Sequence, residues 1–214
     1  MKADTAGFFH RTHLKSQGHL KEMFEGRPVV GIANSASELV PCNSHLTDLA
    51  QWVARGVLEA GGFPLVFPTM SIGDSLMRPS GMMFRNLMSM ELEELLRGNP
   101  IDGVVLMTGC DNTAPAYAMG AASVDLPSIM VHAGPMMSGS FRSKAVGSGT
   151  DIYKLYDDSR KGSLSAAAFA DANAVVVSQV ARLDQLAAGE RLDPERLMKE
   201  IEGQGKPAAY LPDA

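Results

Sequence analysis

The sequence predicts an α/β fold: a three-layer domain with a mainly parallel sheet flanked by helices, followed by a helical C-terminal tail. Short apolar runs, typical of strands buried on both faces, alternate with longer stretches that have helical periodicity. No hairpin signal joins one strand to the next. Strands that alternate with helices in this way are typical of parallel sheets with right-handed crossovers.

Each element of the domain has its own local signal. The first strand is expected at 28–33, where PVVGIA is flanked by turn-forming residues. Asn43 or Ser44 can cap the helix that follows, and Gly61-Gly62 ends it. The further strands are expected at 63–67, 101–107 and 127–132, and the helices at 45–60, 82–97 and 114–122.

The chain changes character after the fourth strand. Residues 134–149 are rich in Gly, Ser and Met and are expected to form a loop. Helices are then expected at 150–160, 165–188 and 194–202. Near residue 165 the composition becomes Ala-rich and loses Met, so we expect a domain over 1–164 and a divergent helical tail over 165–214.

Composition excludes several classes of protein. The 214 residues are 45% hydrophobic with a net charge of −5, which indicates a globular chain without the basic surface that nucleic acids bind. No apolar run is long enough to span a membrane, and the N-terminus lacks the apolar core of a signal peptide. Two cysteines make no disulfide scaffold, so a cytoplasmic location is expected.

Residues suited to metal binding follow three of the four predicted strands. Ligands of open parallel sheets bind at the carboxyl ends of the strands, where the first three loops carry Cys42, Asp74 and the pair Cys110 and Asp111, and the fourth loop follows His132. Thiolates select zinc, copper or iron–sulfur clusters, whereas carboxylates select Mg²⁺. The alternative is that Cys42 and Cys110 are small buried hydrophobic residues.

Other side chains near this edge have two interpretations each. His45 can contact a metal or substrate, or it can be an exposed residue of a first helical turn. His132 can equally be a core histidine. Arg78 and Arg85 can clamp a carboxylate, or they can be solvated charges. The Met-rich helix at 82–97 can line an adaptable pocket or fill the core.

Several motifs, in order, resemble those of one enzyme family. They are SELVPCNSHL, GVLEAGGFP, DSLMRPSGMMFRNL, NPIDGVVLMTGCDNTAPA, GAASVDLPSIMVHAGPM and GSGTDIYK. Together they resemble the N-terminal part of the dihydroxy-acid and sugar-acid (aldonate) dehydratases, a family that includes phosphogluconate dehydratase. The resemblance covers about residues 8–169. HRTHLKSQG and MRPSGMMFRNL are more similar to the sugar-acid branch.

The resemblance implies a hydro-lyase that eliminates water from a 2,3-dihydroxy carboxylate, such as an aldonate, to give a 2-keto-3-deoxy acid. It also implies an iron–sulfur cluster, held by three cysteines, as the Lewis acid on the leaving 3-hydroxyl. A 2Fe-2S cluster is favoured over a 4Fe-4S cluster. A Mg²⁺ ion is implied for the substrate carboxylate and 2-hydroxyl. The family's base is a serine in a C-terminal region that has no counterpart here, so the catalytic residue is unknown.

The family's metal ligands are transferred by position. Cys42 in PCN and Cys110 in GCD match two cluster ligands, and Asp111 matches a Mg²⁺ ligand. Asp74 stands where the family usually has a Mg²⁺-binding glutamate, which shortens the side chain by one methylene. Asn112 stands where the family usually has a lysine, often carbamylated, so a negative ligand is lost.

The resemblance stops near residue 169. There the family continues with the motif that contains its third cluster cysteine, whereas this sequence reads DANAVVVSQVARLDQLAAGERLDPERL and has no third cysteine. We therefore expect a truncated or diverged dehydratase that is inactive alone. The alternatives are one subunit of a split dehydratase, whose partner supplies the C-terminal domain, and a non-catalytic sugar-acid-binding or regulatory module. A homo-oligomer is expected, because a missing C-terminal domain would expose apolar surface.

Overall fold

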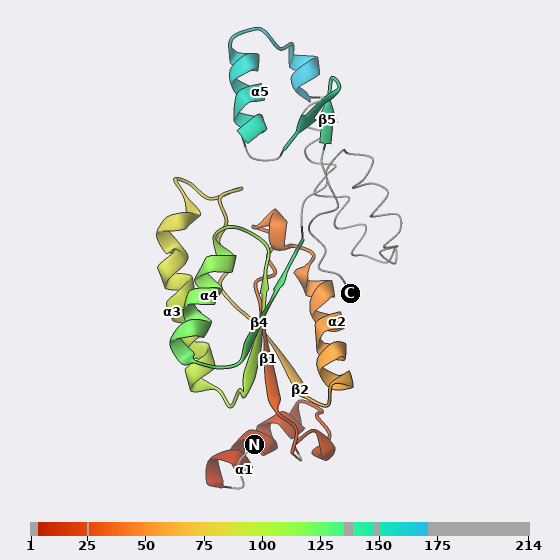
Figure 1. Cartoon of the computed structure of the whole chain (residues 1–214), viewed down its shortest axis with the longest axis vertical. Helices are drawn as coiled ribbons and strands as arrows, with labels where there is room; N and C mark the ends of the chain where they lie inside the picture. The colour runs from red at the N-terminus through yellow and green to blue at the C-terminus, as the bar shows by residue number, and fades with distance from the viewer. Residues whose placement is uncertain (1–3, 25, 135–138, 148–149, 171–214) are drawn as a thin grey trace, which may run out of the picture. The chain divides into compact units, whose positions relative to one another are not determined.

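The computed structural model describes residues 4–24, 26–134, 139–147 and 150–170. The chain divides into two compact units, 1–135 and 136–214. The first unit has the predicted α/β architecture, with a four-stranded sheet and helices on both faces (Figure 1). It also contains every candidate metal-binding residue, so it is the part that positions the site.

All four strands of the sheet are parallel, in the order β2-β1-β3-β4. Their bounds lie close to those predicted: β1 Val29–Asn34, β2 Phe63–Pro68, β3 Gly103–Thr108 and β4 Ser128–His132. Central strands β1 and β3 are almost entirely buried because helices cover both of their faces. The parallel arrangement brings all four carboxyl ends to one edge.

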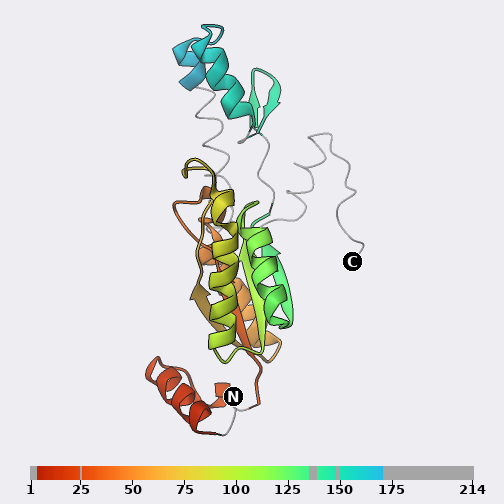
Figure 2. The same cartoon turned by 90° about the vertical axis from the view of Figure 1, so that its left-hand side faces the viewer.

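Helices form the two outer layers. One face of the sheet is covered by α2 (Leu46–Glu59), whose Leu46 and Ala50 pack against Ile32 and Val105. Two helices, α3 (Arg85–Gly98) and α4 (Thr113–Val124), lie side by side on the opposite face (Figures 1 and 2). Neighbouring strand residues therefore face opposite layers, as the two-residue period of a strand requires.

A short N-terminal segment closes the amino-terminal end of the sheet. It comprises α1 (Thr5–Ser16) and the 3₁₀ turn η1 (Lys21–Phe24), and sequence analysis did not predict it. Asp4 caps α1 by accepting a hydrogen bond from the Gly7 backbone N–H at 2.8 Å. Phe24 packs against Val29 and Phe63, which links the segment to the sheet.

The second unit differs from its prediction in one respect. Residues 139–147 contain a hairpin of β5 (Gly139–Phe141) and β6 (Lys144–Val146), so the expected loop is wrong there. Its turn places Arg142 and Ser143 at φ values of 50° and 62°. Neither is the Asn, Asp or Gly that marks such turns, so the sequence carried no hairpin signal.

The helical predictions for the C-terminal part are tested only in part. α5 (Thr150–Arg160) confirms the helix at 150–160, and residues 166–170 begin the one expected at 165–188. The rest of that helix and the one at 194–202 lie outside the described residues. The domain boundary at 164/165 stays a prediction.

The structure corrects two local expectations in the first unit. β4 pairs only with β3, so it is an edge strand rather than a strand buried on both faces, and His132 at its end is exposed, which excludes the core histidine of its two interpretations. Asn43 does not cap α2. Its side-chain amide donates to Ser35 and Ser71 instead, and the N-cap residue is His45, whose side chain makes no capping hydrogen bond.

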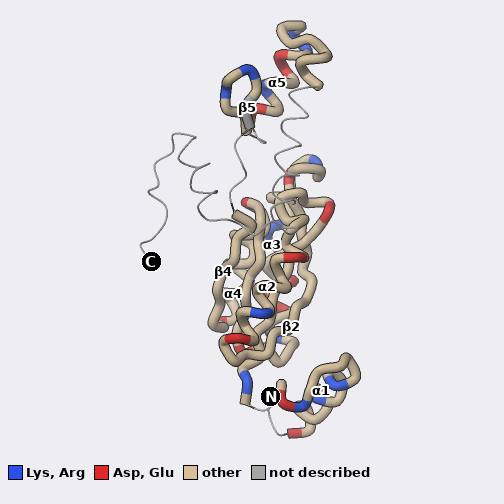
Figure 3. The backbone as a smooth tube through the Cα atoms, turned by 90° about the vertical axis from the view of Figure 1, so that its right-hand side faces the viewer, with Lys and Arg blue, Asp and Glu red and all other residues tan. Residues whose placement is uncertain are grey.

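Charge and helix hydropathy can be described for the same residues. Basic and acidic residues are interspersed along the described backbone, without a continuous basic band (Figure 3). None of the helices in the described ranges combines the length and the apolar composition that crossing a bilayer requires.

Candidate metal and substrate site

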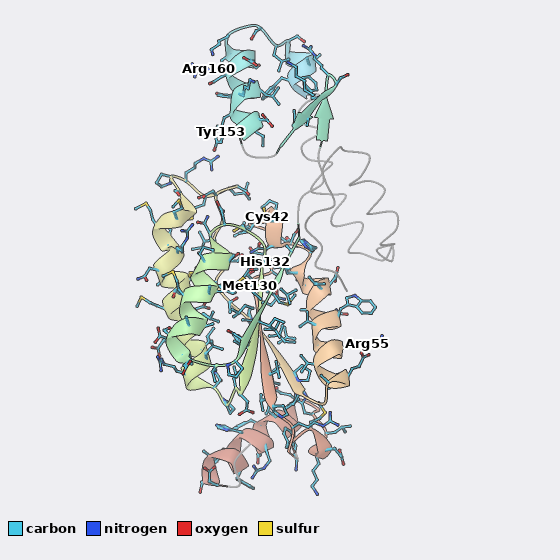
Figure 4. The ribbon with its side chains drawn as sticks, viewed as in Figure 1. Cys42, Arg55, Met130, His132, Tyr153 and Arg160 are labelled. Carbon is cyan, nitrogen blue, oxygen red and sulfur yellow. The ribbon has the colours of Figure 1, made fainter. Side chains whose placement is uncertain are left out.

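The candidate residues gather at the carboxyl-terminal edge of the sheet. Cys42 lies in the 3₁₀ turn η2 (Pro41–Asn43) after β1, Asp74 lies after β2, and Cys110 follows β3 by two residues. His132 ends β4. Figure 4 shows Cys42 and His132 at this end of the sheet, with Arg55 farther along α2. The predicted clustering at one edge is therefore what the topology produces.

Both thiols are free and half-buried. Burial raises the pKa of the Cys42 thiol above its ordinary value, and the nearby Cys110 and Asp111 raise it further. The two loops touch through their backbones, because a Cβ at Gly109 would overlap with the carbonyl oxygen of Cys42. The fold thus brings together two thiols that are 68 positions apart in the sequence.

A buried polar network lies beneath Cys42. Asn43 is fully buried, and its Nδ2 donates to the Ser35 carbonyl and hydroxyl oxygens at 3.1 Å each and to Ser71 Oγ at 2.9 Å. Ser35 Oγ in turn donates to the Met107 carbonyl oxygen at 2.7 Å. These bonds connect the loop after β1 to the loop after β2 and to the end of β3.

The carboxylate of Asp74 is exposed but hydrogen-bonded on both oxygens. Oδ1 accepts from the Gly81 backbone N–H, and Oδ2 accepts from Asn112 Nδ2 at 3.1 Å. The Gly81 N–H, then the Asn112 amide, hold the pKa of Asp74 below its ordinary value. A carboxylate has about four lone-pair sites, so these two bonds leave room for a cation.

Arg85 fixes the loop that carries Asp111. Its Nη2 donates to the Asp111 carbonyl oxygen at 2.9 Å and to Asn112 Oδ1 at 3.3 Å. The Asn112 amide therefore has one orientation, with its oxygen toward Arg85 and its nitrogen toward Asp74. The Asp111 carboxylate stays exposed beside this chain of bonds.

The loop that leads to Asp74 is anchored at its base by two helices. From α4, the buried hydroxyl of Tyr117 hydrogen-bonds with Thr69 and donates to the Met70 carbonyl oxygen at 3.2 Å. From α3, both carboxylate oxygens of Glu91 accept from the Met70 N–H, at 3.0 and 3.2 Å. Burial raises the pKa of Tyr117, so its hydroxyl stays protonated and able to donate.

The remaining candidates have contacts of their own, outside the bonds that join Asp74, Asn112 and Arg85. His45 is half-buried, with Nε2 3.3 Å from the Ala133 carbonyl oxygen, rather than simply exposed. His132 Nδ1 lies 3.0 Å from Thr108 Oγ1. Arg78 is exposed, and its Nη1 donates to the carbonyl oxygens of Asp74 and Met77 at 2.9 and 2.8 Å. Of the Met-rich helix, Met88 lies in the core and Met90 is exposed, so core packing is confirmed for Met88 and pocket lining stays a prediction.

Sequence analysis missed Asn43, Glu91 and Tyr117 as site-forming residues. The position of Asn43 just before a predicted helix favours a helix cap instead. Tyr117 carried a usable signal, since it is the only aromatic residue in the otherwise small α4 segment TAPAYAMGAASV. Glu91 had no comparable signal, because it lies among other acidic residues of a helix.

The donor set fits part of a soft-metal group and part of a hard-metal site. Cys42 and Cys110 provide two thiols, and Asp74 and Asp111 provide two carboxylates on adjoining loops. Within the described ranges, no three side chains from His, Cys, Asp and Glu come together as a metal-holding group. Cys42 and Cys110 are the two cysteines of the sequence, so these 214 residues offer two thiolates to a metal group.

Comparison with known proteins decides the family. The model of the dihydroxy-acid/6-phosphogluconate dehydratase N-terminal domain matches residues 27–180, which include the whole sheet and every candidate residue. The chain belongs to the dihydroxy-acid/6-phosphogluconate dehydratase family. This confirms the resemblance on which the metal ligands were transferred.

Curated members of this dehydratase family are clearly similar. The chain is 50% identical to the L-arabonate dehydratase of Azospirillum brasilense over 171 residues, which are 80% of this chain and 29% of that protein. It is 48% identical over 162 residues to the 6-deoxy-6-sulfo-D-gluconate dehydratase of Pseudomonas putida, covering 76% and 28%. A dihydroxy-acid dehydratase of Methanobrevibacter smithii is 40% identical over 140 residues, covering 63% and 25%.

The match is confined to a limited part of these dehydratases. This chain spans less than a third of the length of the relatives named above. Membership of the family therefore rests on the α/β domain and the residues directly after it, 27–180.

Proposed function

We propose that this chain is the metal- and substrate-binding N-terminal part of a sugar-acid dehydratase, a hydro-lyase acting on a 2,3-dihydroxy carboxylate such as an aldonate. The observation that carries the proposal is the joint placement of two thiols and two carboxylates at one edge of the sheet. The sugar-acid names of similar relatives support this choice of substrate class.

In this proposal Cys42 and Cys110 hold an iron–sulfur cluster, of the 2Fe-2S type, and Asp111 and Asp74 hold Mg²⁺. When bound, the two groups supply Lewis-acid chemistry to the leaving hydroxyl and charge stabilisation to the substrate carboxylate. Asn112 keeps Asp74 beside the Asp111 loop, and Arg85 keeps that loop in place. Exposed Arg78, with further N–H donors, is suited to the anionic end of the substrate.

We propose that protein outside these 214 residues completes the site for catalysis. The 214 residues hold two cysteines, and the resemblance places the family's third cluster cysteine and its serine base in a region without a counterpart here. A separate C-terminal-domain subunit would meet this need. A homo-oligomer is proposed on another ground, the apolar surface that the domain would otherwise expose. The purified chain alone is then expected to bind a sugar acid without dehydrating it.

A second function is favoured by the bonding of Asp74. Both of its oxygens already accept N–H bonds, one of them from Asn112, which stands where the family usually has a lysine, often carbamylated, so that a negative ligand is lost. This arrangement also suits a non-catalytic module that binds sugar acids or regulates another protein, without a cluster.

Calorimetric titration of the reduced full chain with L-arabinonate tests the proposal and separates it from the alternative. The dehydratase proposal predicts binding that needs Mg²⁺ and becomes tighter after reconstitution with iron and sulfide. Mg²⁺-dependent binding that iron does not change would support the binding module. No binding of L-arabinonate or D-xylonate under any of these conditions would refute both, and turnover by the chain alone would refute the need for a partner.

A further inference from the structure

The two cysteine loops meet at one contact, between Asn43 and Gly109. Each is a sequence neighbour of a thiol, because Asn43 follows Cys42 and Gly109 precedes Cys110. Asn43 is fully buried, and its amide nitrogen is bound to Ser35 and Ser71 as described above. The backbone beside Cys42 is therefore fixed by bonds to two other segments.

Gly109 is required by space rather than by backbone conformation. Its φ does not lie in the left-handed region, yet a Cβ there would overlap with Asn43 Oδ1 and with the Cys42 carbonyl oxygen, and would lie 3.0 Å from Asn43 Cγ. On the other side, the N–H groups of Gly109 and Cys110 lie within 3.3 Å of their acceptor, Thr113 Oγ1. Gly109 thus has Asn43 on one side and the start of α4 on the other.

Asn43 Oδ1 is buried without a hydrogen-bond partner among the described residues. A buried polar atom left unpaired is costly and rare in folded proteins, so its presence at this contact needs an explanation. The close contact of Oδ1 with Gly109 explains it. The Asn43 side chain packs between the Cys42 loop and the Cys110 loop, and its size limits how closely the two loops approach.

We propose that Asn43 and Gly109 act as a spacer that sets the separation of the Cys42 and Cys110 thiols, which makes Asn43 a positioning residue for a soft metal group bound by both. This rests on the proposed function only in taking the two thiols to act on one group. Neither residue touches the metal. Their effect passes through the backbone of the two neighbouring cysteines.

Cadmium titration of the reduced, metal-free full chain tests this spacer without assembly of a cluster. Cd²⁺ alone is the probe, because it prefers thiolates and its sulfur charge-transfer absorption reports Cd–S bonds directly. The wild-type chain is expected to bind one Cd²⁺ through both thiols. Loss of either thiol, in Cys42→Ser or Cys110→Ser, is expected to weaken binding by about 100-fold, since the second linked ligand is lost.

Gly109→Ala is the decisive variant and Gly56→Ala is its matched control. Gly109→Ala is expected to weaken Cd²⁺ binding by at least about tenfold, as is usual when groups that orient a metal ligand are disturbed. Gly56, inside α2, has open space where its Cβ would stand, so Gly56→Ala leaves the affinity unchanged. Asn43→Ala removes one of the two oxygens that the new Cβ meets, so the double variant Asn43→Ala/Gly109→Ala recovers part of the loss.

The possible outcomes are distinct. Wild-type affinity in a folded Gly109→Ala chain would overturn the spacer, and so would a Cys42→Ser chain that binds Cd²⁺ as the wild type does. Where circular dichroism shows that Gly109→Ala is unfolded, Asn43→Ala alone decides, with weaker Cd²⁺ binding expected and unchanged binding contradicting the proposal. A chain that binds Cd²⁺ through both thiols but takes up no iron and sulfide keeps the spacer and refutes the dehydratase cluster.

Discussion

The thiols and the carboxylates of the candidate site share one edge of the sheet, but different kinds of structure hold them. The cysteine loops rest on a buried network built around Asn43, and they touch at Gly109. Asp74 and Asp111 are exposed, and their loops are tied by hydrogen bonds from Gly81, Asn112 and Arg85. The half-buried thiols therefore rest on a buried polar network, whereas the carboxylates are exposed to solvent.

This difference in burial matches the chemistry proposed for the thiols and for the carboxylates. A soft metal group held by few protein ligands needs thiols at a fixed separation, which a packed interior provides. A hard cation that binds together with a substrate needs carboxylates accessible to solvent and substrate. The comparison predicts that substitutions beneath the thiols affect folding, while substitutions among the carboxylates affect ligands.

The largest effect is expected for Asn43→Ala. It removes three hydrogen bonds and leaves Ser35 and Ser71 with unmet polar groups, so the free energy of unfolding should fall by about 2–3 kcal/mol. Asp111→Asn, on the exposed side, should change it by less than about 0.5 kcal/mol. Urea denaturation of the two variants measures these changes. Equal changes in the free energy of unfolding would contradict the difference drawn between the thiols and the carboxylates.

A smaller effect is expected for Tyr117→Phe, which removes the hydroxyl beneath the Asp74 loop. Loss of its bonds to Thr69 and Met70 should lower the free energy of unfolding by about 1 kcal/mol at pH 7.

The pH dependence of the free energy of unfolding is expected to distinguish Tyr117→Phe from the wild type. Burial raises the folded-state pKa of Tyr117 above 10.0, so its contribution is complete below pH 10 and decreases as the pH rises beyond it. Wild-type stability should therefore fall more steeply between pH 9 and about pH 11 than that of Tyr117→Phe. Parallel curves in urea denaturation over this range would contradict the buried, protonated hydroxyl.

The smallest effect is expected for Asn112→Ala on the titration of Asp74. Loss of the Asn112 amide should raise the pKa of Asp74, which stays below its ordinary value because the Gly81 N–H, the larger cause, remains. A carboxyl group whose pKa is lower in the folded state than in the unfolded state stabilises the fold above its unfolded-state pKa. This stabilisation is lost as the pH falls through the folded-state pKa. NMR titration measures it, with Asn86→Ala, an exposed asparagine of α3, as the control that leaves the pKa unchanged.

Sequence reasoning predicted the sheet because buried parallel strands leave a strong local pattern. The apolar runs around Val30, Val66 and Val105 were recognised, and topology then brought Cys42 and Cys110 to one edge. The β5–β6 hairpin was missed because Arg142 and Ser143 turn the chain without a turn-forming sequence.

The contacts that shape the site could not be predicted from the sequence, for a different reason. They join residues far apart in the chain, as Asn43 with Ser71 and Asp74 with Asn112, which no local pattern encodes. Asn43 looked like a helix cap because its type and position suit one. Only the tertiary fold shows that its amide is needed elsewhere.

The central claim is that this sheet edge holds a metal group through both thiols. Iron and acid-labile sulfide per chain, measured with the visible spectrum after anaerobic reconstitution, test it most directly. The account predicts equal iron and sulfide, about two of each per chain for a 2Fe-2S cluster, lost in both Cys42→Ser and Cys110→Ser. A wild-type chain without iron and sulfide, or variants that retain both, would contradict it.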